Sequence, residues 1–97
     1  MAKANGRRAV VVTTEFRGVF FGYLAEDHTP EKVMLENARN CVYWSQDVKG
    51  VFGLAANGPT SGCRIGPAVP AITLVQITSV TDCSPAAIKA WEAATWN

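Results

Sequence analysis

Apolar and polar positions alternate along much of this 97-residue chain in the manner of a β-sheet protein. Residues 8–14 are apolar and β-branched, residues 15–18 end in a glycine, and residues 19–25 form a second apolar run. Two such runs around a short turn predict an antiparallel hairpin. Residues 26–31 mark the next turn, and alternation over residues 32–36 predicts a third strand with Val33 and Leu35 on one face.

The sequence then predicts a polar corner at residues 37–40 and a fourth strand at residues 41–44. Successive side chains of a strand point to opposite faces, so Tyr43 and Trp44 are expected to point in opposite directions. One of them then meets a ligand while the other packs in the core. Residues 8–44 are therefore predicted to form a four-strand meander, preceded by a flexible, solvated tail at residues 1–7.

Residues 45–70 are rich in Gly, Pro, Ser and Thr. Val48, Phe52 and Ala55 fall at helical spacing before Asn57-Gly58-Pro59, so a short helical turn ending there is expected. The remainder is predicted to be an irregular insertion. Ordering so long a connection costs entropy that few buried contacts return, which favours a functional role. A structural loop, whose glycines only permit turns, is the alternative.

The end of the chain predicts one long strand and one helix. The strand is expected at residues 71–83, and its alternation places on one face the residues Ile72, Leu74, Gln76, Thr78 and Val80. Ser84 is the expected N-cap and Pro85 the first residue of a helix within residues 84–95. Trp91 is expected in the core, and Trp96 against the domain or a neighbouring subunit.

These elements predict a mainly β fold in a single domain of residues 1–97. The expected architecture is a small, strongly bent antiparallel sheet or barrel of about five strands, with an irregular insertion and a C-terminal helix. A core of this size is marginal, so we expect a homo-oligomer in which the terminal helix or the insertion contributes to the interface.

Composition narrows the classes of partner. A net charge of +1 provides no strong field for DNA or a membrane surface, and it argues against general RNA binding. The apolar run at residues 9–12 is too short for a signal peptide or a membrane span. A soluble cytoplasmic protein is therefore expected.

The sequence offers no pattern typical of catalysis or metal binding. Cys41, Cys63 and Cys83 form no CxxC pair and no zinc-ligand spacing, so reduced, partly buried thiols are expected. His28, the single histidine, lies in a predicted turn, and no base can be assigned to Cys63. There is no P-loop and no dinucleotide fingerprint. We therefore expect neither an enzyme nor a cofactor.

The residue types around the insertion instead suit a small, planar, anionic ligand. Arg64, Thr60, Ser61 and glycine N–H groups can bind phosphate oxygens, and Tyr43 or Trp44 offers a stacking face. These five side chains are the predicted ligand-binding residues. The alternative is an interaction module or inhibitor that binds a host protein or RNA through a small-barrel surface.

Two family resemblances add context. The order of strand signals in the first 40 or so residues is similar to Sm-like small barrels, which implies an oligomeric ring or cluster. Segments 17–20, 37–45, 58–67 and 83–85 (RGVF, NARNCVYWS, GPTSGCRIGP and CSP) resemble a mostly uncharacterised family of small phage and prophage proteins. Such phage proteins include anti-defence "sponges". The resemblance therefore implies a protein of the host cytoplasm that sequesters a cyclic oligonucleotide without turnover.

Overall fold

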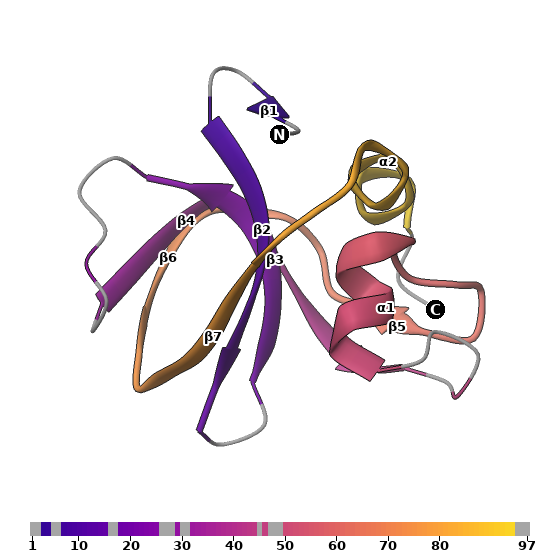
Figure 1. The fold of residues 1–97 in the computed structure, drawn as a ribbon, viewed down its shortest axis with the longest axis horizontal. Helices are drawn as coiled ribbons and strands as arrows, with labels where there is room; N and C mark the ends of the chain where they lie inside the picture. Colours follow the sequence, from indigo (N-terminus) through magenta and orange to yellow (C-terminus); the bar gives the residue numbers. More distant parts are fainter. Residues whose placement is uncertain are drawn as a thin grey trace.

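The computed structural model describes residues 3–4, 7–15, 18–25, 29, 32–44, 46 and 50–94. The elements follow in the order β1 (Lys3–Ala4), β2 (Arg7–Thr14), β3 (Val19–Leu24), β4 (Lys32–Tyr43), α1 (Gly50–Ala56), β5 (Arg64–Ile65), β6 (Val69–Val75), β7 (Ile77–Asp82) and α2 (Pro85–Ala93). The predicted fold class is confirmed: the protein is mainly β, with a bent antiparallel sheet and a C-terminal helix (Figure 1).

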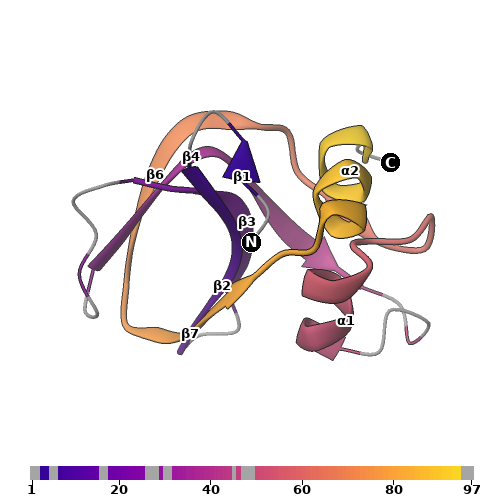
Figure 2. The same cartoon turned by 45° about the horizontal axis from the view of Figure 1, so that its top comes forward.

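The sheet curls strongly without closing into a barrel. Its main strands follow the order β7-β2-β3-β4-β6, and β5 pairs with the end of β4. Consecutive strands β6 and β7 meet at Gln76 but pair with β4 and β2 rather than with each other (Figure 2). Both helices pack on one side of the curl, beside β5.

Curling buries the central strands on both faces and creates two separate hydrophobic cores. We call the set inside the curl the inner core; it consists of Val10, Val12, Leu24, Val33, Leu35, Ala38 and Leu74. We call the set beneath the helices the helix-covered core; it consists of Ala9, Val11, Val19, Phe21, Tyr23, Cys41, Leu54, Ala55, Cys63, Ile65, Cys83, Ala87 and Trp91. Adjacent residues of β2 therefore serve different cores, as alternation along a strand requires.

Trp91 organises the helix-covered core, which confirms its predicted burial. Its ring stacks on Phe21 with centroids 5.1 Å apart, and its indole N–H donates to the carbonyl oxygen of Leu54 at 3.0 Å. Ser84 is the N-cap of α2, as predicted, because its hydroxyl accepts from the N–H of Ala87 at 3.1 Å. The same hydroxyl donates to the carbonyl oxygen of Ala56. These bonds join α2 to α1.

The expected four-strand meander is wrong in its second half. Residues 32–36 and 41–44 were expected as separate strands, but β4 is one strand of 12 residues. The polar corner is only a local bend: Asn37 has φ +48°, and the β3–β4 register shifts between Phe21 and Tyr23. Asparagine adopts this conformation more readily than most residues, so the strand bends without ending.

The expected single strand at residues 71–83 is also wrong, because the chain bends at Gln76, where φ is +57°. The bend shifts the alternation by one residue. Leu74 is buried and Ser79 is half-buried, whereas Val80 is 38% exposed. The predicted face running through Gln76 and Val80 therefore does not exist. The cause is tertiary, since β6 and β7 pair with different strands.

Two further expectations are corrected near the N-terminus and in the insertion. Lys3–Ala4 pairs with Arg7 and Arg8, so part of the expected tail belongs to the sheet. The insertion is not irregular throughout, since it holds α1, β5 and the start of β6. The predicted helix stop is confirmed: Gly58 has φ +82° and its N–H donates to the carbonyl oxygen of Leu54 at 3.0 Å.

Three side chains named from the sequence, those of His28, Val48 and Trp96, lie outside the described residues. Neither helix of the described part of the chain has the length and apolarity needed to cross a bilayer.

Candidate ligand-binding site

The ladder between β4 and β5 brings Tyr43 and Arg64 together. Cys41 pairs with Ile65 and Tyr43 pairs with Arg64, so Val42 is an extra residue that forms a β-bulge in β4. Side chains directly opposite one another in a ladder project to the same face. Tyr43 is 56% exposed, and Arg64 is also exposed. A phenol ring and a guanidinium group therefore share one accessible surface.

Trp44, the neighbour of Tyr43, lies in a different environment. Its side chain is partly buried and packs against the helix-covered core. Of the two adjacent aromatic residues, Tyr43 is therefore the one with a ring face open to a ligand, while Trp44 supports the fold beneath it.

A shallow surface hollow of about 490 Å³ is lined by Asn40, Val42, Gly66 and Pro67, which are near Tyr43 and Arg64 in the chain, although neither of these two side chains lines it. The N–H of Gly66 donates to the carbonyl oxygen of Asn40 at 2.9 Å. A Cβ atom at position 66 would lie 2.2 Å from Oδ1 of Asn40, so any larger residue would displace that amide. The hollow thus offers one amide group and an apolar wall next to the ladder that carries Tyr43 and Arg64.

Thr60 and Ser61 lie at a different cavity. They belong to a turn closed by the N–H of Cys63, which donates to the carbonyl oxygen of Thr60 at 3.0 Å. With Cys63, Ile65 and the end of α2 they line a cavity of about 250 Å³. Cys63 and Ile65 are buried while Arg64 between them is exposed, so Arg64 points away from this cavity. The structure therefore places Tyr43 and Arg64 on one surface, and Thr60 and Ser61 at a separate cavity.

Arg39 is a residue of the site region that sequence reasoning missed. Its guanidinium group donates to the carbonyl oxygens of Gly66 at 2.8 Å, Trp91 at 2.8 Å and Ala94 at 2.7 Å. A cation is favourable at the C-terminal end of a helix, where backbone carbonyls are otherwise unpaired. Arg39 thus fastens the segment after β5 to the end of α2. No local sequence signal marks it, because an arginine in a polar corner resembles a solvated one.

Burial sets the chemistry of the cysteines, which are free, as predicted, and are buried rather than partly buried. Desolvation by burial, followed by the proximity of Cys63, raises the pKa of Cys41 to about 12. Desolvation by burial, followed by the charge of Asp82, raises the pKa of Cys83 to about 12. Both are therefore thiols near neutral pH, without the thiolate character of a nucleophile. Within the described residues, no group of three or more His, Cys, Asp and Glu side chains is placed to hold a metal ion.

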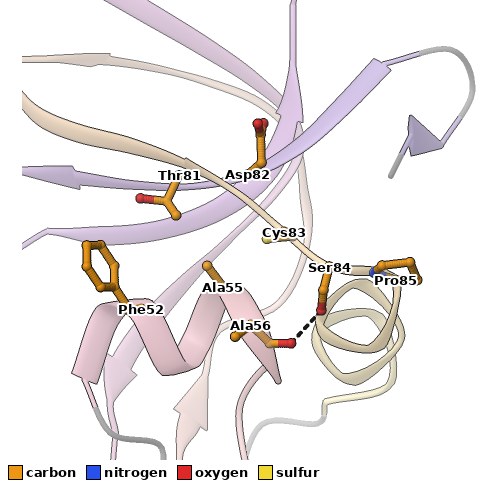
Figure 3. Close-up of a pocket in the computed structure, with 8 residues that line it drawn as sticks. All are labelled: Phe52, Ala55, Ala56, Thr81, Asp82, Cys83, Ser84 and Pro85. Atoms are coloured by element: carbon orange, nitrogen blue, oxygen red, sulfur yellow. Dashed lines mark hydrogen bonds between the residues drawn. The ribbon is translucent and has the colours of Figure 1, made fainter. Parts of the chain in front are cut away.

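A larger groove lies between α1 and the connection from β7 to α2 (Figure 3). It has a volume of about 680 Å³, and Phe52 of α1, 77% exposed, stands at one end. Asp82 lies at the rim, where its carboxylate is 2.7 Å from the guanidinium group of Arg8. Sequence reasoning missed this groove as well. Its lining side chains are mostly apolar, with one carboxylate, so it suits an anion poorly.

A family model described as a domain of unknown function (DUF6948) matches residues 7–91. The matched range runs from β2 to Trp91 and so contains both cores and the β4–β5 ladder. No curated protein and no solved structure matches the chain.

Proposed function

The chain belongs to the DUF6948 family, a domain of unknown function, and we propose that it is a binding protein for a small phosphorylated molecule that carries an aromatic base. The observation that supports this proposal is the pairing of Tyr43 with Arg64 across the β4–β5 ladder. A base stacked on an aromatic side chain gains about 1–3 kcal/mol. A guanidinium group beside it can donate two parallel hydrogen bonds to a phosphate.

A cyclic oligonucleotide is the ligand class that we propose. Its covalent ring holds bases and phosphates at a fixed separation, so little conformational entropy is lost when a stacking face and a cation engage them together. The hollow of about 490 Å³ is within the size range of small-molecule sites, and the amide of Asn40 on its wall can hydrogen-bond a base edge.

The proposed role is sequestration without turnover. The described residues that line the hollow include no carboxylate and no imidazole, the groups that most often move protons in catalysis. Together with the resemblance to small phage proteins, this supports an anti-defence sponge that acts in the host cytoplasm.

The test is calorimetry with a panel of cyclic dinucleotides, cyclic trinucleotides and cyclic ADP-ribose isomers. We expect one member of the panel to bind tightly and to be recovered intact, by mass spectrometry, after the protein is denatured. Tyr43→Ala and Arg64→Ala should each weaken binding by roughly tenfold to a hundredfold, since each removes one charge-assisted or stacking contact. Both side chains are exposed, so the melting temperature should hardly change.

Phe52→Ala is the matched control for Tyr43→Ala, because it removes another exposed aromatic ring outside the hollow. It should leave affinity unchanged. Ser61→Ala tests the cavity of Thr60 and Ser61 in the same way. If Ser61→Ala weakens binding and Arg64→Ala does not, the ligand belongs in that cavity. If no member of the panel binds below about 10 μM, the proposal fails. A host protein that is retained by the wild type in pull-downs but lost with Phe52→Ala would then support the interaction module.

A further inference from the structure

Strand β6 is an edge strand of the sheet. It pairs with β4 from Lys32–Val75 to Ala38–Val69 without a register shift, and no strand among the described residues pairs with its other edge. Val75 is 56% exposed and Val69 is 41% exposed. An edge strand of this kind presents unpaired backbone groups to another chain.

Backbone bonds on the far side of β4 establish which groups face β6. The N–H of Ala25 donates to the carbonyl oxygen of Met34 at 2.9 Å, so Met34 directs its backbone groups toward β3. These groups alternate in direction along a strand. Those of Val33 and Leu35 therefore point toward β6.

The same alternation defines the outer edge of β6. Leu74 and Ile72 lie opposite Val33 and Leu35 and bond to β4. It follows that the N–H and C=O groups of Ala71, Thr73 and Val75 point away from β4. Three donor and acceptor pairs, at alternate residues, are thus presented along the outer edge of the strand.

The outer edge of β6 lacks the features that usually prevent edge pairing. No charged residue occurs from Pro67 to Thr81, a stretch that includes the whole of β6. Pro70 belongs with Ile72 to the set whose nitrogen atoms face β4, so it does not interrupt the outer row. Lysines, outward prolines and bulges are the usual protection of a soluble edge strand, and β6 has none of them.

We propose that β6 is a dimerisation strand, which pairs antiparallel with β6 of a second copy of this chain about a two-fold axis at Thr73. Thr73 then lies opposite the partner subunit's Thr73, and Ala71 lies opposite the partner subunit's Val75. The two sheets become one continuous sheet, and the exposed Val75 gains Ala71 of the partner subunit as an apolar neighbour across the axis.

The charges that flank the edge do not oppose a second copy in this direction, since exposed charges this far apart are largely screened. In the β4–β6 ladder Lys32 lies opposite Val75, and Glu36 lies opposite Ala71. Antiparallel pairing therefore builds rows that carry Lys32 at one end and the partner subunit's Glu36 at the other, about 14 Å apart over three strand spacings. Parallel pairing would instead place Lys32 level with the same residue of the partner. The strand edge itself is uncharged, so nothing in the contact opposes self-pairing.

Thr73→Lys tests the proposal, because it places two like charges directly opposite each other at the axis. The side chain of Thr73 is exposed, so the monomer should keep its melting temperature. Wild-type protein should sediment at about 21 kDa, twice the chain mass of 10.4 kDa. Thr73→Lys should raise the dimer dissociation constant by about tenfold or more. Thr78→Lys, the same change at an exposed position of β7, is the matched control and should remain dimeric.

Amide hydrogen exchange supplies a second readout. The amides of Ala71 and Val75 should exchange slowly in the wild type and rapidly in Thr73→Lys, whereas those of Ile72 and Leu74 should stay protected in both. The proposal is overturned if the wild type is a monomer at about 100 μM or if Thr73→Lys remains a dimer. It is also overturned if the mass of the wild type increases with concentration without limit. If only Thr78→Lys dissociates the dimer, the contact belongs to β7. If the protein is a monomer and binds a host peptide along β6, the occupant of this edge is that peptide and not a second copy.

Discussion

The two cores on opposite faces of the curled sheet differ in chemistry. The buried side chains of the inner core are all aliphatic, with Phe20 packed against them, so they stabilise the fold through shape and apolar area. The helix-covered core contains Trp91, Phe21, Tyr23 and all three cysteines. Two of its aromatic side chains also bear polar groups that hydrogen-bond to the helices: the indole N–H of Trp91 donates to the carbonyl oxygen of Leu54 in α1, and the hydroxyl of Tyr23 donates to Glu92 of α2. These bonds orient the helices, which aliphatic packing alone does not do.

The same division separates the two proposed surfaces. Cys41 and Ile65 of the helix-covered core belong to the ladder from which Tyr43 and Arg64 project, so the proposed ligand site is built on that core. Leu74 of β6 belongs to the inner core, so the proposed dimer edge is built on the other. Substitutions in one core should therefore affect one surface more than the other.

Trp91→Ala should give the largest effect on stability. It removes the stacking on Phe21 and leaves the carbonyl of Leu54 unpaired, which should lower the free energy of unfolding by about 3–5 kcal/mol. Trp91→Phe is the control, since it keeps a ring against Phe21 but loses the indole N–H. Trp91→Phe should lower the free energy of unfolding, measured by urea denaturation, by less than Trp91→Ala does. A loss below about 1 kcal/mol for Trp91→Ala would show that the helix-covered core does not depend on this residue.

Arg39→Met should come next, with a loss of about 1.5–3 kcal/mol, because three carbonyl oxygens lose a charged donor. It should also weaken any ligand that binds at Arg64, since Gly66 is released from α2. Arg39→Lys keeps the charge but lacks the planar fork, so it should recover only part of both effects. If calorimetry gives the same ligand affinity for Arg39→Met and the wild type, the ligand site does not depend on the hydrogen bonds of Arg39.

Gly22→Ala should disturb the region where β3 packs on Leu35 of the inner core. A Cβ atom at this position would lie 2.7 Å from Cβ of Leu35, which must shift at a cost of about 1–3 kcal/mol. The dimer edge should weaken with it, while ligand affinity should remain close to that of the wild type. Gly50→Ala, with open space but φ +79°, is a control for backbone strain alone. Reduced ligand affinity with an intact dimer in Gly22→Ala would contradict the separation of the two cores.

Alkaline pH should destabilise the helix-covered core gradually. The pKa values of Cys41 and Cys83 are raised from 9.0 to about 12, and burial also raises the pKa of Tyr23. The unfolded chain therefore loses these protons first, and stability present below pH 9 should decline as the pH rises from about 9 toward 12. Cys83→Ala should reduce this slope in denaturation curves measured at successive pH values. An unchanged slope would mean that other groups cause the decline.

Part of the fold and of the site could be predicted from local sequence signals. Apolar runs on either side of a short turn predicted β2 and β3, Ser84-Pro85 predicted the start of α2, and Gly58 predicted the end of α1. Each of these signals acts through a residue's own backbone preference or through burial of one face, so neighbouring residues suffice to reveal it. Tyr43 and Arg64 were candidates for the same reason, as residue types suited to a base and a phosphate.

Only the tertiary structure decided how these elements combine. Asn37 and Gln76 adopt positive φ values because β4 and the β6–β7 segment must pair with different strands along their lengths, and no local pattern encodes such a requirement. The bulge at Val42 aligns Tyr43 with Arg64, while the turn before β5 places Thr60 and Ser61 at another cavity. Strand register depends on contacts between residues far apart in the sequence. The sequence by itself therefore determined the candidate side chains, and the pairing of β4 with β5 determined which of them share a surface.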